Sequence, residues 1–199
     1  MSLLFETIKI LDGEPRHLYW HNIRLNRSRR EFWHPTNEID LTEMIRVPEE
    51  FRTGLVSCNV YYEKEVQNIT FKAYIRREIR RLRLVFPQFV DYHVKYTDRS
   101  VLEFLLTQKG ECDDIIIVMN GFLTDTSVSN LIFFNGSDWI TPENPLLTGV
   151  TRERLLSEGK IKTGKIRDTD LNKYEGCKLI NAMREPEYEP LIPVQAIFK

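Results

Sequence analysis

The 199-residue sequence lacks the motifs that mark several common classes of enzyme and binding protein. It contains no GxGxxG or GxxxxGK[ST] motif, so it predicts neither a dinucleotide site nor a P-loop. Its histidines do not have the HExxH spacing, and its three cysteines, Cys58, Cys112 and Cys177, include no CxxC pair. We therefore expect no metal or redox centre, and reduced cysteines that pack as small apolar residues.

Long apolar runs and a strong charge of one sign are also absent. No stretch is long enough to cross a bilayer, and the first residues do not combine a basic region with a cleavable apolar core. The net charge of −1 argues against a nucleic-acid partner for the chain as a whole. These absences predict a cytoplasmic protein that does not use a membrane.

The elements that the sequence does predict are short strands and helices in mixed order. Residues 3–10 alternate as a strand does, and residues 17–33 carry apolar residues at roughly helical spacing. Asn120-Gly121 and Asn135-Gly136 each stand between two apolar runs, which is typical of a β-hairpin turn. Hairpins therefore dominate the expected fold.

The second half of the sequence adds two helices to these hairpins. One is expected over 101–110, and the other opens after Gly149 and ends at Gly159. We predict an α+β fold with a boundary near 86–88. The expected division is a small N-terminal α+β lobe over 1–88 and a larger C-terminal lobe over 89–199.

The segment "RREIRRLR" places five arginines within residues 76–83. An RNA-binding strip is one interpretation of such a segment. Ile79 and Leu82 interrupt the arginines, however, and the rest of the chain is nearly neutral. Solvated arginines on a half-buried element are the interpretation that we favour.

Three residues combine into a candidate cofactor site. Lys95 lies in the strand-like run "VDYHVKYT", and an amine in partly apolar surroundings can act as a nucleophile or base. Asp125 lies among hydroxyl and amide side chains in "GFLTDTSVSN". Thr151 follows Gly149 at an expected helix start, where free backbone N–H groups bind anions. Pyridoxal phosphate requires an amine, a carboxylate and a phosphate cradle. Each residue alone also has an ordinary interpretation, as a surface lysine, a turn residue or an N-cap.

The chain resembles the class IV pyridoxal-phosphate enzymes, which include branched-chain and D-amino-acid aminotransferases and aminodeoxychorismate lyase. The segments that carry the resemblance occur in the family's order and are "FETIKILDG", "HNIRLNRS", "VKYTDR", "GFLTDTSVSN", "LLTGVTR" and "LINAM" with "LIPV". The resemblance implies a two-lobed fold-type IV enzyme. Because the family usually carries further residues before "FET", it also implies an abbreviated N-terminal lobe.

The resemblance assigns roles to individual residues. Lys95 would be the catalytic lysine that forms the Schiff base with pyridoxal 5′-phosphate. Arg24, the Val150 N–H and Thr151 would bind the cofactor phosphate. Asp125 stands where the family has a glutamate that meets the pyridine nitrogen, and it is one methylene shorter. The other cofactor contacts that the resemblance implies are Ser129, Asn130, Asn181 and Ala182.

The resemblance leaves two reactions open. Asp98-Arg99 after Lys95 is closer to the K-x-x-N-R of the lyases, and "NAM" is similar to their N-A-L. A lyase of this type, which belongs to folate biosynthesis, converts 4-amino-4-deoxychorismate into 4-aminobenzoate and pyruvate. A class IV aminotransferase acting on a branched-chain or D-amino acid is the alternative. A cofactor-free or RNA-binding relative is a further one.

The sequence predicts a small-molecule amino substrate without identifying the residues that bind it. Arg99 is a weak candidate for the substrate carboxylate, and Arg76 and Arg184 are others. The resemblance also implies a homodimer. Phe5, Tyr19 and Trp20 would serve its interface or pack in the core.

Overall fold

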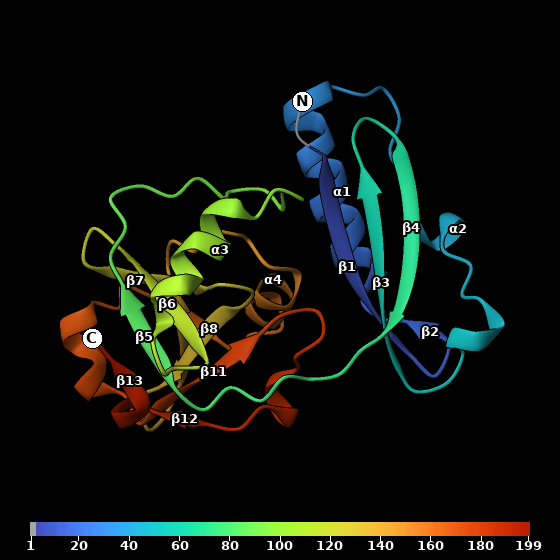
Figure 1. Cartoon of the computed structure of the whole chain (residues 1–199). Coiled ribbons are helices and arrows are strands. Elements are labelled where there is room, and N and C mark those ends of the chain that lie inside the picture. The colour runs from blue at the N-terminus through green and yellow to red at the C-terminus, as the bar shows by residue number, and fades with distance from the viewer. Residues whose placement is uncertain (1–2) are drawn as a thin grey trace. The chain divides into compact units, whose positions relative to one another are not determined.

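The computed structural model describes residues 3–199, which form two compact units (Figure 1). The first unit contains the chain up to Arg76 together with Val94–Asp98, and the second contains Arg77–His93 and Arg99–Lys199. This division differs from the expected lobes in two places. Residues 77–88 belong to the second unit, and the segment that carries Lys95 returns to the first.

The first unit is built on a four-stranded antiparallel sheet in the order β2-β1-β3-β4. Strand β1 (Leu4–Leu11) alternates buried and half-buried residues, so one face of the strand points into the core. Helix α1 (Leu18–Trp33) contacts β1 (Figure 1). The remaining elements are β2 (Glu14–Pro15), α2 (Leu41–Met44), η1 (Glu49–Phe51), β3 (Leu55–Tyr62) and β4 (Val66–Ala73).

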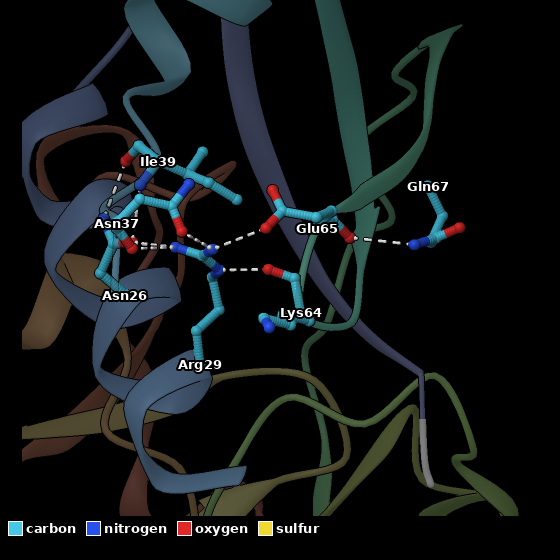
Figure 2. A network of polar contacts seen from close by, with 7 residues as sticks. All are labelled: Asn26, Arg29, Asn37, Ile39, Lys64, Glu65 and Gln67. Atoms are coloured by element: carbon cyan, nitrogen blue, oxygen red, sulfur yellow. Dashed lines mark hydrogen bonds and ion pairs between the residues drawn. The ribbon is translucent and has the colours of Figure 1, made fainter. Parts of the chain in front are cut away.

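A fully buried arginine on α1 joins the helix to two loops (Figure 2). Arg29 donates from Nε to the Lys64 carbonyl at 2.7 Å, in the turn between β3 and β4. Its Nη1 donates to Asn26 Oδ1 at 2.9 Å and to the Asn37 carbonyl at 3.0 Å. Asn26 in turn donates to the Ile39 carbonyl at 2.8 Å. Because a buried guanidinium requires partners for its donors, this network fixes the register of α1 against the sheet.

The second unit is a mixed sheet with the strand order β10-β9-β8-β7-β6-β5-β13, to which β11 is added through β8. Its buried core includes Ile116, Leu131 and Phe133. The strands are β5 (Leu82–Val85), β6 (Asp114–Met119), β7 (Phe122–Thr126), β8 (Asn130–Phe134), β9 (Trp139–Pro142), β10 (Lys162–Gly164), β11 (Gly176–Ile180), β12 (Ile192–Pro193) and β13 (Ile197–Phe198). The helices are α3 (Ser100–Leu106), η2 (Thr107–Lys109), α4 (Val150–Ser157), η3 (Asp168–Lys173), η4 (Pro186–Tyr188) and η5 (Val194–Ala196).

The α+β class predicted from the sequence is confirmed. Asn120 and Gly121 both have positive φ, 53° and 80°, as the predicted tight turn between β6 and β7 requires. All three cysteines are free and buried, as expected. Within residues 3–199, no helix has the length and apolar character that a membrane span needs.

The arginine-rich segment makes contacts within the second unit. Arg80 pairs with Glu78 at 2.8 Å, and the Asp113 carboxylate accepts the backbone N–H groups of Arg80 and Arg81 at 2.8 and 2.9 Å. The Arg81 guanidinium lies 5.0 Å from the centre of the Phe198 ring. Arg80 and Arg81 are exposed while Ile79 and Leu82 are buried, which agrees with the predicted solvated arginines on a half-buried element.

Candidate active site

A buried carboxylate lies at the centre of the candidate site in the second unit. Asp125 is on β7, directly opposite Asn130 on β8, and is only 5% exposed. Its Oδ1 accepts from Asn130 Nδ2 at 2.9 Å, and its Oδ2 accepts from the Leu147 N–H at 2.8 Å. Burial raises the pKa of Asp125 to about 7 despite these donors. A nearby cation would favour its charged form much more than neutral donors do.

A glycine next to this carboxylate makes room for a close backbone approach. Asn130 Nδ2 also donates to the Leu147 carbonyl at 2.9 Å, which fixes the turn that leads to Gly149. A Cβ on Gly149 would lie 1.9 Å from Asn130 Oδ1, so no other residue fits there without a shift. Helix α4 begins at Val150, and no side chain caps its first turn. The backbone N–H groups of that turn suit an anion.

Two side chains of the first turn of α4 are buried beside this glycine. Thr151 is 2% exposed and Arg152 is 4% exposed. Arg152 donates to the Pro142 carbonyl at 3.0 Å and pairs with Glu153 at 2.8 Å. Its charge lowers the pKa of Asp125, but burial of the carboxylate has the larger effect. Arg152 thus compensates the Asp125 charge only in part.

The remaining predicted cofactor contacts lie where β11 meets β8. Asn181 Nδ2 donates to Ser129 Oγ at 2.9 Å and to the Val128 carbonyl at 3.2 Å. Asn181 Oδ1 accepts the Met183 N–H at 2.9 Å, which shapes the turn that contains Ala182. These contacts and their chain neighbours bring together the residues of the second unit that were predicted as cofactor contacts. These residues are Asp125, Ser129, Asn130, Val150, Thr151, Asn181 and Ala182.

Two of the predicted substrate arginines have partners within the second unit. Arg99 donates to the Ser127 carbonyl at 2.6 Å and to the Tyr92 hydroxyl at 3.2 Å. Arg184 pairs with Glu189 at 2.6 Å and also donates to the Arg77 carbonyl. These contacts hold loops in place, and the binding of a substrate carboxylate by either arginine stays a prediction.

Lys95 lies in the first unit, beside the beginning of β1. Its carbonyl accepts the Phe5 N–H at 3.0 Å, and Leu4 forms a β-bridge with Tyr96. The Lys95 amine lies 4.3 Å from the centre of the Phe5 ring and is on a half-buried residue. The amine therefore has the partly apolar surroundings that the sequence predicts.

Arg24 forms a buried cluster with a carboxylate that the sequence analysis missed. Its Nε and Nη2 donate to the two oxygens of Glu6 at 2.8 and 2.6 Å, and His21 Nδ1 lies 2.6 Å from Glu6 Oε2. Burial alone would raise the Glu6 pKa, but the Arg24 charge and the His21 contact lower it to about 2. The available signal was an acidic residue in the buried row of β1, between Leu4 and Ile8.

The residues of the second unit fit pyridoxal phosphate. Asp125 is a buried carboxylate whose raised pKa would return toward its usual range beside a protonated pyridine nitrogen. The uncapped start of α4, behind a glycine that excludes a Cβ, suits a phosphate. The described residues contain no group of three or more metal-ligating side chains.

Comparison with known proteins gives one family. The profile of the amino-transferase class IV family matches residues 63–196. An uncharacterised protein of Haemophilus influenzae is 38% identical over 185 residues, which cover 92% of this chain and 98% of that protein.

Two solved structures show the same fold. One, from Haemophilus somnus 129pt, is provisionally named a 4-amino-4-deoxychorismate lyase. It has a TM-score of 0.85 and 36% identity, and the match covers 92% of this chain and 97% of that one. The other is a hypothetical aminotransferase of Mycobacterium tuberculosis in its pyridoxal-phosphate-bound form. It has a TM-score of 0.77 at 18% identity, with 98% and 81% covered.

Proposed function

Because this chain belongs to the amino-transferase class IV family, we propose that it is a pyridoxal-phosphate-dependent lyase that converts 4-amino-4-deoxychorismate into 4-aminobenzoate and pyruvate. The observation that carries the cofactor proposal is the buried Asp125, whose pKa of about 7 reflects a carboxylate without full charge compensation. The Haemophilus somnus structure, similar over 92% of this chain, supports the lyase among the reactions of the family.

Asp125 would hold its negative charge against the protonated pyridine nitrogen. Asp125 accepts hydrogen bonds from Asn130 Nδ2 and the Leu147 N–H, and the Leu146 N–H also lowers its pKa. A carboxylate has about four lone-pair sites, so capacity remains for this contact. The Val150 N–H, Thr151 and Arg24 would bind the phosphate. Pyridoxal phosphate, when bound, supplies an electron sink for charge that develops on the substrate carbon.

Lys95 would hold the cofactor covalently before the substrate arrives. The Lys95 amine would accept the proton from the substrate carbon that bears the amino group. The Lys95 amine lies 4.3 Å from the centre of the Phe5 ring, and it would accept the proton in its neutral form. Lys95 is therefore the residue on which activity depends most strongly.

Covalent trapping tests the assignment of Lys95. We expect borohydride reduction of the protein loaded with pyridoxal phosphate to fix the cofactor on the peptide that contains Lys95. The Lys95→Ala variant should lose both this label and all measurable activity. Lys178 offers a matched control, because its amine lies 5.1 Å from the Trp139 ring and it is also half-buried. Lys178→Ala should keep the label on Lys95, and a label on any other lysine would refute the assignment.

A product assay separates the lyase from the second candidate, a class IV aminotransferase acting on a branched-chain or D-amino acid. The family match over residues 63–196 is the observation that keeps this candidate. With 4-amino-4-deoxychorismate as substrate, we expect stoichiometric 4-aminobenzoate and pyruvate. Amino transfer between amino and keto acids without 4-aminobenzoate would identify the aminotransferase instead. The proposal also includes a cytoplasmic homodimer, which light scattering would show as twice the mass of the 23.6 kDa chain.

A further inference from the structure

The Glu6 carboxylate is a fully buried charged group in direct contact with Arg24. Glu6 is 0% exposed, and the Arg24 and His21 side chains that contact it are 8% and 1% exposed. Oε1 accepts from Arg24 Nε at 2.8 Å, while Oε2 lies 2.6 Å from both Arg24 Nη2 and His21 Nδ1. The carboxylate is therefore held at both oxygens.

This pairing fixes the orientation of the guanidinium. A guanidinium is a planar group with donors in fixed directions, so a carboxylate that takes Nε and one terminal nitrogen sets the plane of the whole group. The two contacts with Glu6 use Nε and Nη2. Without these contacts, an arginine side chain would lose considerable rotamer freedom at the moment when it binds a ligand in one geometry.

His21 fixes the carboxylate in turn. His21 and Arg24 are three residues apart on α1 and so face the same side of the helix. Burial lowers the pKa of His21, its contact with Glu6 acts against this, and the charges of Arg24 and Lys95 lower it further. The contact of His21 Nδ1 with Glu6 Oε2, beside the contact from Arg24 Nη2, holds the carboxylate in place.

We propose that Glu6 is a positioning residue that presents the Arg24 guanidinium to the cofactor phosphate in one fixed orientation. This inference rests on the proposed function, in which Arg24 binds that phosphate. Glu6 acts only through Arg24, so its effect is confined to the part of cofactor affinity that depends on the phosphate. The ligand class is a phosphate monoester on a pyridine aldehyde. The same aldehyde without the phosphate has no group for the oriented Arg24 guanidinium to bind.

A comparison of two ligands tests this role. Pyridoxal phosphate and pyridoxal are titrated separately into the cofactor-free protein, and binding is followed by the visible absorbance of the ligand. The wild-type protein should bind pyridoxal phosphate far more tightly than pyridoxal. Glu6→Gln should reduce this preference at least tenfold, with the affinity for pyridoxal nearly unchanged. A general loss of structure would weaken the binding of both ligands.

Several variants keep the outcome interpretable. Glu6→Asp retains the charge but is one methylene too short for the same two-point contact, so it should lose part of the preference even if Glu6→Gln folds poorly. Arg24→Gln should lose the preference, and adding Glu6→Gln to it should cause no further loss. Glu189→Gln is the matched control, since Glu189 is a buried carboxylate paired with Arg184 at 2.6 Å. It should retain the wild-type preference.

The results separate failure of the inference from failure of the proposed function. If Arg24→Gln loses the preference and both Glu6 variants keep it, Glu6 has no positioning role while the proposed function stands. If Arg24→Gln keeps the preference, Arg24 does not bind the phosphate and the inference fails with that assignment. A wild-type protein that binds neither ligand overturns the proposed function and this inference together.

Discussion

Glu6 in the first unit and Asp125 in the second are both buried carboxylates, and their pKa values are shifted in opposite directions. Glu6 in the first unit is fully buried, yet its pKa falls to about 2. Asp125 in the second unit is buried to nearly the same degree, and its pKa rises to about 7. Burial disfavours the charged form of both groups, so burial does not explain the difference.

The difference lies in the partners. Glu6 has a guanidinium on both oxygens, whereas Asp125 has an amide side chain and a backbone N–H. Neutral donors satisfy the hydrogen bonds of a buried carboxylate without balancing its charge. The cluster around Glu6 is therefore electrostatically complete within the chain. The charge of Asp125 is compensated only in part by Arg152, and under the proposed function a protonated pyridine nitrogen would supply the remaining positive charge.

The largest expected effect is on the pH dependence of stability in the cofactor-free protein. The folded-state pKa of Asp125, about 7, lies above its ordinary value of 3.8, so the folded protein binds the extra proton. The contribution of Asp125 to the free energy of unfolding is fully present below pH 3.8 and is lost as the pH rises to about 7. The loss amounts to about 4 kcal/mol, at 1.36 kcal/mol per pKa unit. Asp125→Asn should remove this contribution, which urea unfolding at several pH values measures.

Asp114 provides the control for this measurement. It is 2% exposed, and burial raises its pKa as well, but it lies outside the proposed cofactor contacts. Pyridoxal phosphate should cancel the Asp125 contribution in the wild-type protein and in Asp114→Asn. If the cofactor leaves the pH dependence of the wild-type protein unchanged, Asp125 does not meet the pyridine nitrogen.

Glu6 should produce the opposite pH dependence. Its folded-state pKa of about 2 lies below the ordinary 4.5, so its stabilisation is present above pH 4.5 and is lost as the pH falls through 2. The expected contribution is about 3 kcal/mol. Hydrogen exchange resolved by peptide should therefore show β1 and α1 losing protection in acid. In Glu6→Gln this acid-dependent loss should shrink, and an unchanged acid response would show that Glu6 is not held ionised by Arg24.

Much of the candidate site in the second unit was predictable from the sequence, because its residues lie in short motifs. Asp125 and Asn130 are five positions apart on two paired strands, and Gly149 directly precedes the helix that begins at Val150. An Asn-Gly turn, a glycine before a helix and a carboxylate among hydroxyl groups each have a local physical signature. The class IV resemblance then predicted that these motifs, which occur in the order of the family, form one cofactor site.

The cluster of the first unit was predictable only in part, because it joins residues distant in sequence. The roles of Arg24 and Lys95 were predicted through the resemblance, but Glu6 pairs with Arg24 across 18 positions and has no local motif. Its signal is an acidic residue at a core position of an alternating strand, and this position becomes meaningful only once α1 is known to pack there. The return of residues 94–98 to the first unit likewise depends on pairing with β1, which local patterns do not encode.

The smallest expected effect concerns Arg152, whose charge acts on Asp125 from helix α4. Because this charge lowers the Asp125 pKa, Arg152→Gln should move the pH-dependent loss of stability to higher pH. We expect less than about 1.4 kcal/mol, or one pKa unit, since burial and the direct hydrogen bonds act more strongly. Arg152 also holds the Pro142 carbonyl, so the substitution lowers overall stability as well. The same substitution in an Asp125→Asn background isolates the electrostatic part, because there it should lower stability equally at every pH. A pH-dependent effect that persists in this background would mean that Arg152 acts on another ionisable group. The negative charge of Asp125 would then have even less compensation from positive charges of the chain than the comparison with Glu6 implies.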